Sequence, residues 1–379
     1  MRAMILAAGY GTRLWPLTID RAKPAIPFMG RPLVGYVAEY LARFGFGEIA
    51  VNLHHRGESV RAALGDGGRF GVRFHYVEEP TILGTGGALD NARDFLEAET
   101  FVVVNGKIAT DINLDAALET HRRARALATL VLRENAARER YSMVEVRDGL
   151  VTGFGGSPTS DNVSGAGSAA QTEMSNAGNE FREGAGTDFR EGRGEKVGGR
   201  RVESRVGVEA VTKVGGKAGP TPLMFTGIQI LDPRIFDYIP RGVFSHTVTD
   251  TFIPAIARGE RVAAHVAEGD WYELSTVRRY LETSVALLKR EGRALELGDG
   301  SRVADSADVG ESVLWENARV AGGAKVRRSV LGAGVVVEQG EVFENVAVVR
   351  AELVRGVECP PKGLRGEVRG SNFVAPIPE

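Results

Sequence analysis

The sequence predicts an α/β protein in which helices cover both faces of a mostly parallel sheet, followed by a solenoid of short strands. Three observations support this prediction. Short apolar runs alternate with helical patterns over residues 1–150, a low-complexity stretch follows, and single apolar residues recur every five or six positions after residue 300. At about 150 residues per domain, the 379 residues of the chain correspond to two or three domains.

The first part of the chain alternates strand and helix patterns. The apolar runs with the length of buried strands are 3–8, 48–53, 72–77, 101–105 and 128–133. The helical patterns between and after them are 33–44, 60–64, 88–96 and 114–126. Apolar strands separated by helices are typical of a parallel sheet covered on both faces. In such sheets, ligands bind at the carboxyl ends of the strands.

Charge and composition exclude several classes of protein. The formal net charge is −2, so no global basic field attracts nucleic acid or acidic lipid. The single cysteine, Cys359, excludes a disulfide framework and a cysteine-rich zinc site. No apolar run approaches the roughly 18 residues that a membrane span needs, and the run from Met1 to Gly9 is too short for a signal peptide. We therefore expect a soluble cytoplasmic protein without nucleic-acid or membrane partners.

The composition changes between Val151 and Thr221. This stretch contains no Leu, Ile, Trp or Tyr and is rich in Gly, Ser, Asn, Arg and Glu. Such a segment cannot bury enough apolar area to offset about 1–2 kcal/mol of backbone entropy per residue. We therefore predict that 155–221 is a disordered insertion. It interrupts a first domain made of 1–154 and 222–291.

The last part of the chain has a period of its own. Over 300–350, apolar residues recur at intervals of five or six: Val303, Val309, Leu314, Val320, Val326, Leu331, Val337 and Val342. This spacing favours a solenoid with three short strands in each coil, and the alternative is an ordinary meander of short strands. Because an open coil leaves strand edges uncovered, we expect homo-oligomerisation through the solenoid. The tail at 359–379 is predicted to be loosely ordered.

A glycine-containing loop directly follows the first strand. It reads LAAGYGTRLWPLT from Leu6 to Thr18, and Lys23 and Pro24 come shortly after it. Glycines allow backbone N–H groups to approach a phosphate chain. Arg13 can bind phosphate oxygens through its fork of donors, and Lys23 can place a charge beside a reacting phosphate. The order of residues matches neither a P-loop nor a dinucleotide-binding fingerprint.

With this loop and a second glycine-rich run, LGTGGA at 83–88, the sequence resembles the sugar-1-phosphate nucleotidyltransferases, or nucleotide-sugar pyrophosphorylases. It looks most like the branch that includes mannose-1-phosphate guanylyltransferase, over nearly everything except the insertion and the tail. The resemblance implies a Rossmann-like sheet and a C-terminal left-handed parallel β-helix. The implied reaction transfers a nucleotidyl group from an NTP to a sugar 1-phosphate and releases pyrophosphate, with Mg²⁺ as the cofactor.

The resemblance also implies roles for individual residues. Those that would bind the nucleotide are Leu6, Ala8, Gly9, Gly11, Thr12, Arg13, Lys23, Gly84, Gly86 and Gly87. Those that would contact the sugar are Asn105, Thr226 and Gly227. Arg13 and Lys23 would act in catalysis, by holding the triphosphate and by stabilising charge on the transferred group.

Three positions depart from the family pattern where the chemistry would occur. Lys107 and Glu273 stand where two Asp ligands to Mg²⁺ are expected, and Ser157 stands where a lysine that meets the sugar phosphate is expected. A lysine repels a cation. Lys107 and Glu273 could form an ion pair without metal, Lys107 could instead contact the triphosphate, or Asp111 could join Glu273 as a metal ligand. The alternative for Asp111 is an N-cap or turn residue.

Two functions are compatible with these residues. The loop with Arg13 and Lys23 favours an active nucleotidyltransferase that makes GDP-mannose or a related nucleotide sugar. The alternative is a catalytically weak or inactive nucleotide-sugar-binding regulatory protein of the same fold, which Lys107, Ser157 and Glu273 favour. The two functions differ in whether the bound nucleotide turns over.

Overall fold

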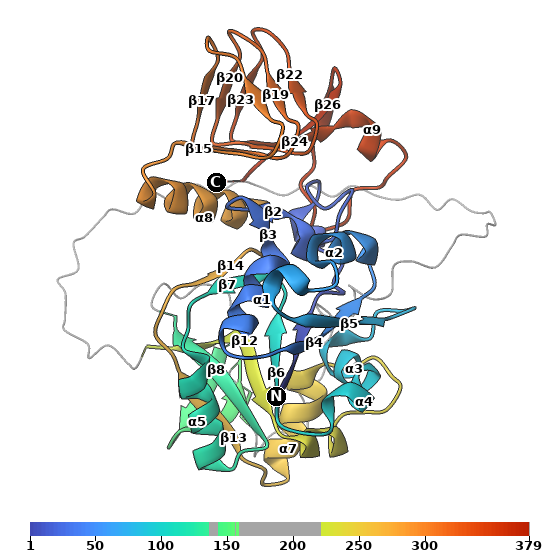
Figure 1. The fold of residues 1–379 in the computed structure, drawn as a ribbon, viewed down its shortest axis with the longest axis vertical. Helices are drawn as coiled ribbons and strands as arrows, with labels where there is room; N and C mark the ends of the chain where they lie inside the picture. Colours follow the sequence, from blue (N-terminus) through green and yellow to red (C-terminus); the bar gives the residue numbers. More distant parts are fainter. Residues whose placement is uncertain (136–142, 156, 159–220, 379) are drawn as a thin grey trace, which may run out of the picture. The chain divides into compact units, whose positions relative to one another are not determined.

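A large mixed sheet forms the centre of the N-terminal part of the chain (Figure 1). The computed structural model describes residues 1–135, 143–155, 157–158 and 221–378. The strands of the sheet are β1 (Arg2–Leu6), β4 (Glu48–Leu53), β5 (Arg73–Glu78), β6 (Phe101–Asn105), β8 (Ala128–Glu134), β9 (Met143–Arg147), β10 (Leu150–Phe154), β11 (Ser157–Pro158), β12 (Leu223–Leu231) and β13 (Val262–Val266). Within the described residues, their order is β11-β10-β13-β8-β12-β6-β1-β4-β5, with β9 beside β10 and β12.

The sheet is mixed, so the expectation of a mostly parallel sheet is wrong. β1 runs parallel to β4 and β6, β4 to β5, and β8 to β13, but β12 runs antiparallel to both β6 and β8. Leu223 at the start of β12 pairs with Glu134 at the end of β8. β12 therefore starts at the edge where β8 ends. A parallel strand would need a crossover, usually a helix, and the described elements between β8 and β12 are strands.

Helices cover both faces of this sheet, as predicted. The helices of this part are α1 (Leu33–Arg43), α2 (Gly57–Leu64), α3 (Gly84–Asn91), α4 (Arg93–Leu96), α5 (Leu114–Ala124), α7 (Ile253–Ala257) and α8 (Val277–Arg290). The shorter turns are η1 (Thr12–Leu14), η2 (Lys23–Ala25), η3 (Gly68–Phe70), η4 (Pro233–Asp237) and the π-helical η5 (Val248–Phe252). None of the described helices is both long enough and apolar enough to span a bilayer.

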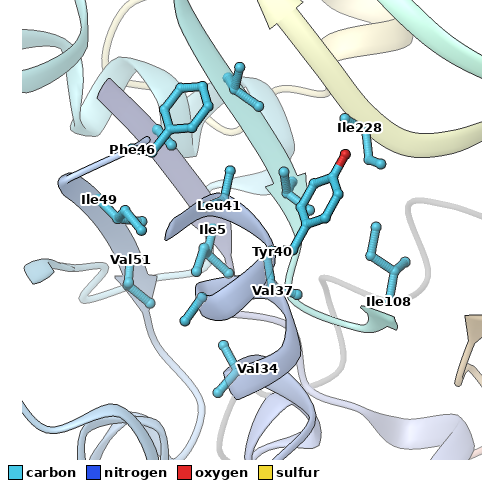
Figure 2. Packing of buried hydrophobic residues seen from close by; sticks show 14 of the residues in the cluster. Ile5, Val34, Val37, Tyr40, Leu41, Phe46, Ile49, Val51, Ile108 and Ile228 are labelled. Atoms are coloured by element: carbon cyan, nitrogen blue, oxygen red, sulfur yellow. The ribbon is translucent and has the colours of Figure 1, made fainter. Parts of the chain in front are cut away.

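Helix α1 shows how the sequence period produces the core. Val34, Val37 and Leu41 recur at intervals of three and four, which places them on one face of a helix. This face packs against the sheet beside Ile5 of β1 and Val51 of β4 (Figure 2). The neighbouring strand residues point to the opposite face of the sheet, where they pack in a second core with α3, α4 and α7.

Three parallel ladders form the C-terminal solenoid within 295–350. One ladder contains β15 (Leu295–Leu297), β18 (Ser312–Leu314), β21 (Val330–Leu331) and β24 (Val346–Arg350); the second contains β16 (Arg302–Val303), β19 (Arg319–Val320) and β22 (Val336–Val337); the third contains β17 (Asp308–Gly310), β20 (Lys325–Arg327) and β23 (Val342–Glu344). Val313 pairs with Val330, and Val330 pairs with Ala347, 17 residues apart in each case. Because neighbouring strands of a meander are antiparallel, these ladders exclude the meander.

The tail completes the solenoid, so the expectation of a loosely ordered tail is wrong for its last strand. After α9 (Ala351–Val354) and β25 (Glu367–Arg369), β26 (Asn372–Pro376) pairs antiparallel with β24. Phe373, Val374 and Ala375 are buried there. Pairing with β26 covers the edge of the last coil. The glycines and prolines of 359–371 hide this short apolar strand from composition-based prediction.

The predicted insertion at 155–221 lies outside the described residues, except for 155, 157–158 and 221. The described residues on the two sides of this segment form one compact unit. β12, which follows the insertion in sequence, lies between β6 and β8, which precede it. Ser157 lies in β11, where it pairs with Phe154 of β10.

The solenoid packs against the segment that follows the glycine-containing loop. The indole Nε1 of Trp315 donates a 2.9 Å hydrogen bond to the Tyr280 hydroxyl of α8, which donates to the Pro27 carbonyl at 2.6 Å. Arg21 lies over the Trp315 ring and forms a 2.6 Å ion pair with Glu316. Pro27 belongs to β2 (Pro27–Phe28), which pairs with β3 (Arg31–Pro32). The solenoid, α8 and residues 21–27 therefore pack against one another around Trp315 and Tyr280.

The first prediction tests this contact. Trp315 is 1% exposed, so Trp315→Ala should lower the free energy of unfolding by about 3–5 kcal/mol. Val342 lies in the same solenoid but is 55% exposed, so Val342→Ala should stay within about 0.5 kcal/mol of the wild type. Urea unfolding at one protein concentration measures both. Equal shifts for the two variants would contradict the packing described.

Candidate functional site

The site lies at the carboxyl ends of β1, β4 and β6. Leu6, the last residue of β1, pairs with Asn52 of β4 on one side and with Asn105 of β6 on the other. The Gly106 N–H donates to the Leu6 carbonyl at 2.9 Å. The loops that follow β1 and β6 therefore begin side by side. This is the edge of an open α/β sheet at which ligands bind.

Gly11 shapes the loop after β1. Its φ of 68° lies in the left-handed region that favours glycine. A Cβ at this position would lie 3.0 Å from Lys23 Cβ and 3.1 Å from Thr18 Cγ2. The glycine therefore allows the loop to approach the Lys23 side chain. Gly9, by contrast, is exposed, with no atom within 4 Å of a Cβ placed on it, so its backbone is open to a ligand.

The other residues predicted to bind nucleotide in this loop differ in exposure. Ala8 is buried, Leu6 and Thr12 are half-buried, and Arg13 is exposed. Arg13 lies in η1 and contributes positive charge at Lys23. The loop therefore exposes a glycine backbone and the cationic side chain of Arg13 to solvent, while Ala8 is buried.

Lys23 is a buried cation beside this loop. It is only 9% exposed, and its ammonium group makes no hydrogen bond or ion pair with the described residues. Burial, together with the positive charges of Lys107 and Arg13, holds the pKa of Lys23 well below its usual range, although Glu273 acts in the opposite direction. A buried ammonium without its own counter-ion is costly. An anion bound here would relieve that cost.

Lys107 and Glu273 form an ion pair at the same site. β7 (Ile108–Thr110) and β14 (Trp271–Glu273) pair antiparallel, with Glu273 opposite Ile108, so the two side chains meet at one end of this ladder. Burial raises the pKa of Glu273, but the adjacent Lys107 ammonium and, less strongly, Lys23 outweigh it and lower that pKa below its usual value. Glu273 is thus an ionised, buried carboxylate already neutralised by lysine.

Asp111 lies at the other end of the β7–β14 ladder. Its Oδ1 accepts a 2.6 Å hydrogen bond from the Asp270 N–H, and because Glu273 pairs with Ile108 at the far end of the ladder, the structure does not bring the two carboxylates together as the predicted ligand pair. Of the alternative predicted for Asp111, an N-cap or turn residue, the N-cap of α5 is instead Asn113, whose side chain accepts from the Ala116 N–H. Asp111 is a loop residue whose hydrogen bond to Asp270 ties two loops together.

A divalent cation does not fit the residues present. In the part of the chain that the structure describes, the carboxylate that acts on the Lys23 ammonium is that of Glu273, and it is paired with Lys107, whereas Mg²⁺ requires oxygen ligands. Among the described residues, no group of three or more His, Cys, Asp or Glu side chains is placed to hold a metal ion. The Mg²⁺ ligands implied by the resemblance are therefore not present at these positions.

The second glycine-rich run opens helix α3 and packs against a distant segment. The N–H groups of Gly86 and Gly87 donate to the Ser245 carbonyl at 2.8 and 3.3 Å. Gly84 has a φ of 73°, and a Cβ on it would collide with the same carbonyl. The half-exposed Phe244 lies against Gly84. The immediate reason for these glycines is close packing, and the amides of 86 and 87 are occupied within the fold.

Sequence reasoning missed a buried polar network on this side of the site. Asn52 accepts from the Ala7 N–H at 2.7 Å and donates to Glu79 Oε1 at 2.7 Å, while Glu79 Oε2 accepts from the Leu83 N–H at 3.0 Å. Burial raises the pKa of Glu79 although these hydrogen bonds oppose the rise. The network joins the loop after β1 to the loop before α3. The available signal was Asn52, which interrupts the apolar run that follows Glu48 in this strand.

The residues predicted to contact the sugar meet at the end of β6. A Cβ on Gly227, whose φ is 84°, would collide with the Asn105 side chain, so these two residues are in close contact. Thr226 is buried, and its hydroxyl donates to the Val131 carbonyl at 2.7 Å. The Trp271 indole N–H donates to the Thr226 carbonyl at 3.0 Å. Thr226 therefore uses its polar groups to hold the wall of the site.

Curated relatives cover most of the chain. One is a UTP–glucose-1-phosphate uridylyltransferase from Synechocystis, 27% identical over 92% of this chain and 82% of the relative. Another is a mannose-1-phosphate guanylyltransferase from Mycobacterium tuberculosis, 26% identical over 90% of this chain and 83% of the relative.

A solved structure shares the fold. The crystal structure of HddC from Yersinia pseudotuberculosis matches with a TM-score of 0.51 at 19% identity, over 76% of this chain and 99% of that one. The family model described as nucleotidyl transferase matches residues 2–290. That match spans both sides of the 155–221 segment and includes every cationic residue of the site. The chain belongs to the nucleotidyl transferase family.

Proposed function

We propose that this chain transfers a nucleotidyl group from an NTP to a sugar 1-phosphate, forming an NDP-sugar and pyrophosphate. The observation that carries the proposal is the buried, unpaired Lys23 beside the open loop at Gly9 and Arg13, at the carboxyl ends of β1 and β6. The names of the relatives, a uridylyltransferase and a guanylyltransferase acting on hexose 1-phosphates, support the same reaction class.

The reaction needs alignment and positive charge rather than a protein nucleophile. A phosphate oxygen of the sugar 1-phosphate attacks the α-phosphorus, and a new O–P bond forms. The bond from the α-phosphorus to the bridging oxygen breaks, and its electron pair leaves with pyrophosphate. In our proposal Arg13 binds the outer phosphates, Lys23 stabilises the charge that develops on the transferred group, and N–H groups of the loop from Leu6 to Thr12 bind phosphate oxygens.

The two sides of the site suit the two substrates. We place the sugar against Asn105 and Gly227, with Thr226 holding that wall in position. We place the nucleoside toward Gly84, whose loop is fixed by the network of Asn52 and Glu79. We also propose that the solenoid is a left-handed parallel β-helix and that copies of the chain associate through it.

The second prediction tests turnover. The purified full chain should release pyrophosphate from at least one pair among GTP, UTP, dTTP, ATP and CTP with mannose 1-phosphate or glucose 1-phosphate. A coupled pyrophosphate assay and chromatography of the NDP-sugar measure it, with each NTP alone as the control. Nucleotide-sugar binding without turnover on any pair, with Mg²⁺ or Mn²⁺ supplied, would favour the regulatory alternative instead.

The third prediction concerns the two cations. Arg13→Ala and Lys23→Ala should each lower kcat/KM about 10²–10³-fold, because each removes charge that stabilises the transition state. Arg278→Ala is the matched control, since Arg278 is an exposed arginine of α8 that pairs with Glu282. It should change kcat/KM by less than about twofold. A Lys23→Ala variant with full activity would reject the assigned role of Lys23.

The fourth prediction follows from the lowered pKa of Lys23. As pH rises through that pKa the free protein loses the Lys23 proton, whereas a bound phosphate keeps the ammonium charged. Pyrophosphate binding should therefore take up a proton in this window, and its affinity should fall as pH rises. Calorimetry in buffers of different ionisation enthalpy measures the uptake.

The control for this measurement is Lys23→Arg. Arginine stays protonated throughout the range, so proton uptake should disappear in this variant while pyrophosphate still binds. Equal uptake in the wild type and in Lys23→Arg would assign the proton to another group.

A further inference from the structure

The cation cluster formed by Arg13, Lys23 and Lys107 has more positive charge than the neighbouring Glu273 carboxylate can balance. Arg13, Lys23 and Lys107 supply three positive charges, and Glu273 supplies one negative charge. These three neighbours, Lys107, Glu273 and Arg13, are the charged groups that shift the pKa of Lys23. A site with a net charge of +2, in which one of the two uncompensated cations is the buried Lys23 ammonium, is suited to a polyanion.

Lys107 is held where its charge can serve either Glu273 or a ligand. The Leu274 N–H donates to the Lys107 carbonyl at 3.2 Å, which fixes the backbone of this residue to the strand end that carries Glu273. The Lys107 side chain is 31% exposed, whereas that of Glu273 is 9% exposed. The carboxylate is therefore enclosed, whereas the lysine side chain that pairs with it is partly open to solvent.

We propose that Lys107 performs the charge-balancing role of a divalent cation in this site, so that the chain binds the pyrophosphate portion of an NTP without a metal. The inference rests on the proposed function for its substrate and goes beyond it in assigning the counter-charge. When the polyphosphate binds, the Lys107 ammonium turns its hydrogen bonds from Glu273 to phosphate oxygens. Glu273 then remains beside Lys23, and its negative charge reduces the repulsion between the cationic side chains.

The experiment uses inorganic pyrophosphate and tripolyphosphate as probes, with binding to the full chain measured by calorimetry in EDTA and in Mg²⁺. The wild type should bind both probes in EDTA, and Mg²⁺ should not strengthen binding more than about threefold. Lys107→Asp should weaken binding in EDTA on the order of 100-fold, about tenfold for each unit of charge. Because the introduced carboxylate would then lie beside that of Glu273 and supply oxygen ligands, Mg²⁺ should restore much of this loss.

Two further variants keep the test decisive if Lys107→Asp fails to fold. Glu273→Gln frees Lys107 from its partner and should bind pyrophosphate about tenfold more tightly than the wild type. Lys107→Gln with Glu273→Gln removes both charges of the pair and leaves the net charge of the site unchanged, so it should bind about as tightly as the wild type and about tenfold more weakly than Glu273→Gln. Lys289→Asp is the matched control, because Lys289 pairs with Glu311 on the surface at 2.7 Å. It should change affinity less than about twofold.

The outcomes separate this inference from the proposed function. Pyrophosphate binding that requires Mg²⁺ in the wild type, or equal affinities of wild type and Lys107→Asp in EDTA, would overturn the inference. NDP-sugar synthesis that stops in EDTA would also overturn it and leave the proposed function standing. Metal-free pyrophosphate binding through Lys107 with no turnover on any substrate pair would support the inference while the proposed function fails.

Discussion

The burial of Lys23 is the constraint on which the rest of the site depends. An ammonium group removed from water needs compensating charge, and the neighbouring groups are two further cations and one carboxylate that is already paired. While Lys23 is protonated, the folded chain therefore holds an unfavourable charge at the carboxyl edge of the sheet. Such an arrangement persists only where the surrounding packing enforces it, and it makes anion binding favourable before any specific contact with a sugar or a base is considered.

The solenoid supplies part of that packing, on either side of the residues next to Lys23. The segment that carries Lys23 contacts it through Arg21 and Glu316 at 2.6 Å, and the Gly30 N–H donates to Glu296 of β15 at 2.6 Å. The aromatic contact between Tyr280 and Trp315 lies beneath the same segment. A coil whose strands carry no residue of the site thus fixes the segment that carries the buried cation. This gives the C-terminal part a role in the site that is independent of oligomerisation.

Much of the fold follows from local patterns, and the failures share one cause. Strand and helix positions over 1–130 and the coil period depend on neighbouring residues, so the sequence predicts most of them to within a few residues. The exception is the helix predicted at 88–96, which is two helices, α3 and α4. The antiparallel β12, the edge pairing of β26 and the Asn52–Glu79 network depend on which distant segments meet. Lys107 and Glu273 lie 166 positions apart. The sequence shows their charges, but their contact follows only from the pairing of β7 with β14. Asp111 looked like a ligand by proximity in sequence, yet the same ladder carries it to the opposite end.

An ion pair and a metal ion differ as sources of positive charge in a phosphate site. A divalent cation arrives with the nucleotide and bridges two oxygens, so its charge is absent from the free protein. Lys107 is always present, and Glu273 holds its charge in a neutral pair until an anion competes for it. The free site therefore avoids three mutually repelling cations, whereas the liganded site can use all of them. A single ammonium group cannot hold two oxygens rigidly. Alignment of the phosphates therefore depends on Arg13, Lys23 and the loop at Gly9, and so on the solenoid contacts that fix the segment carrying Lys23.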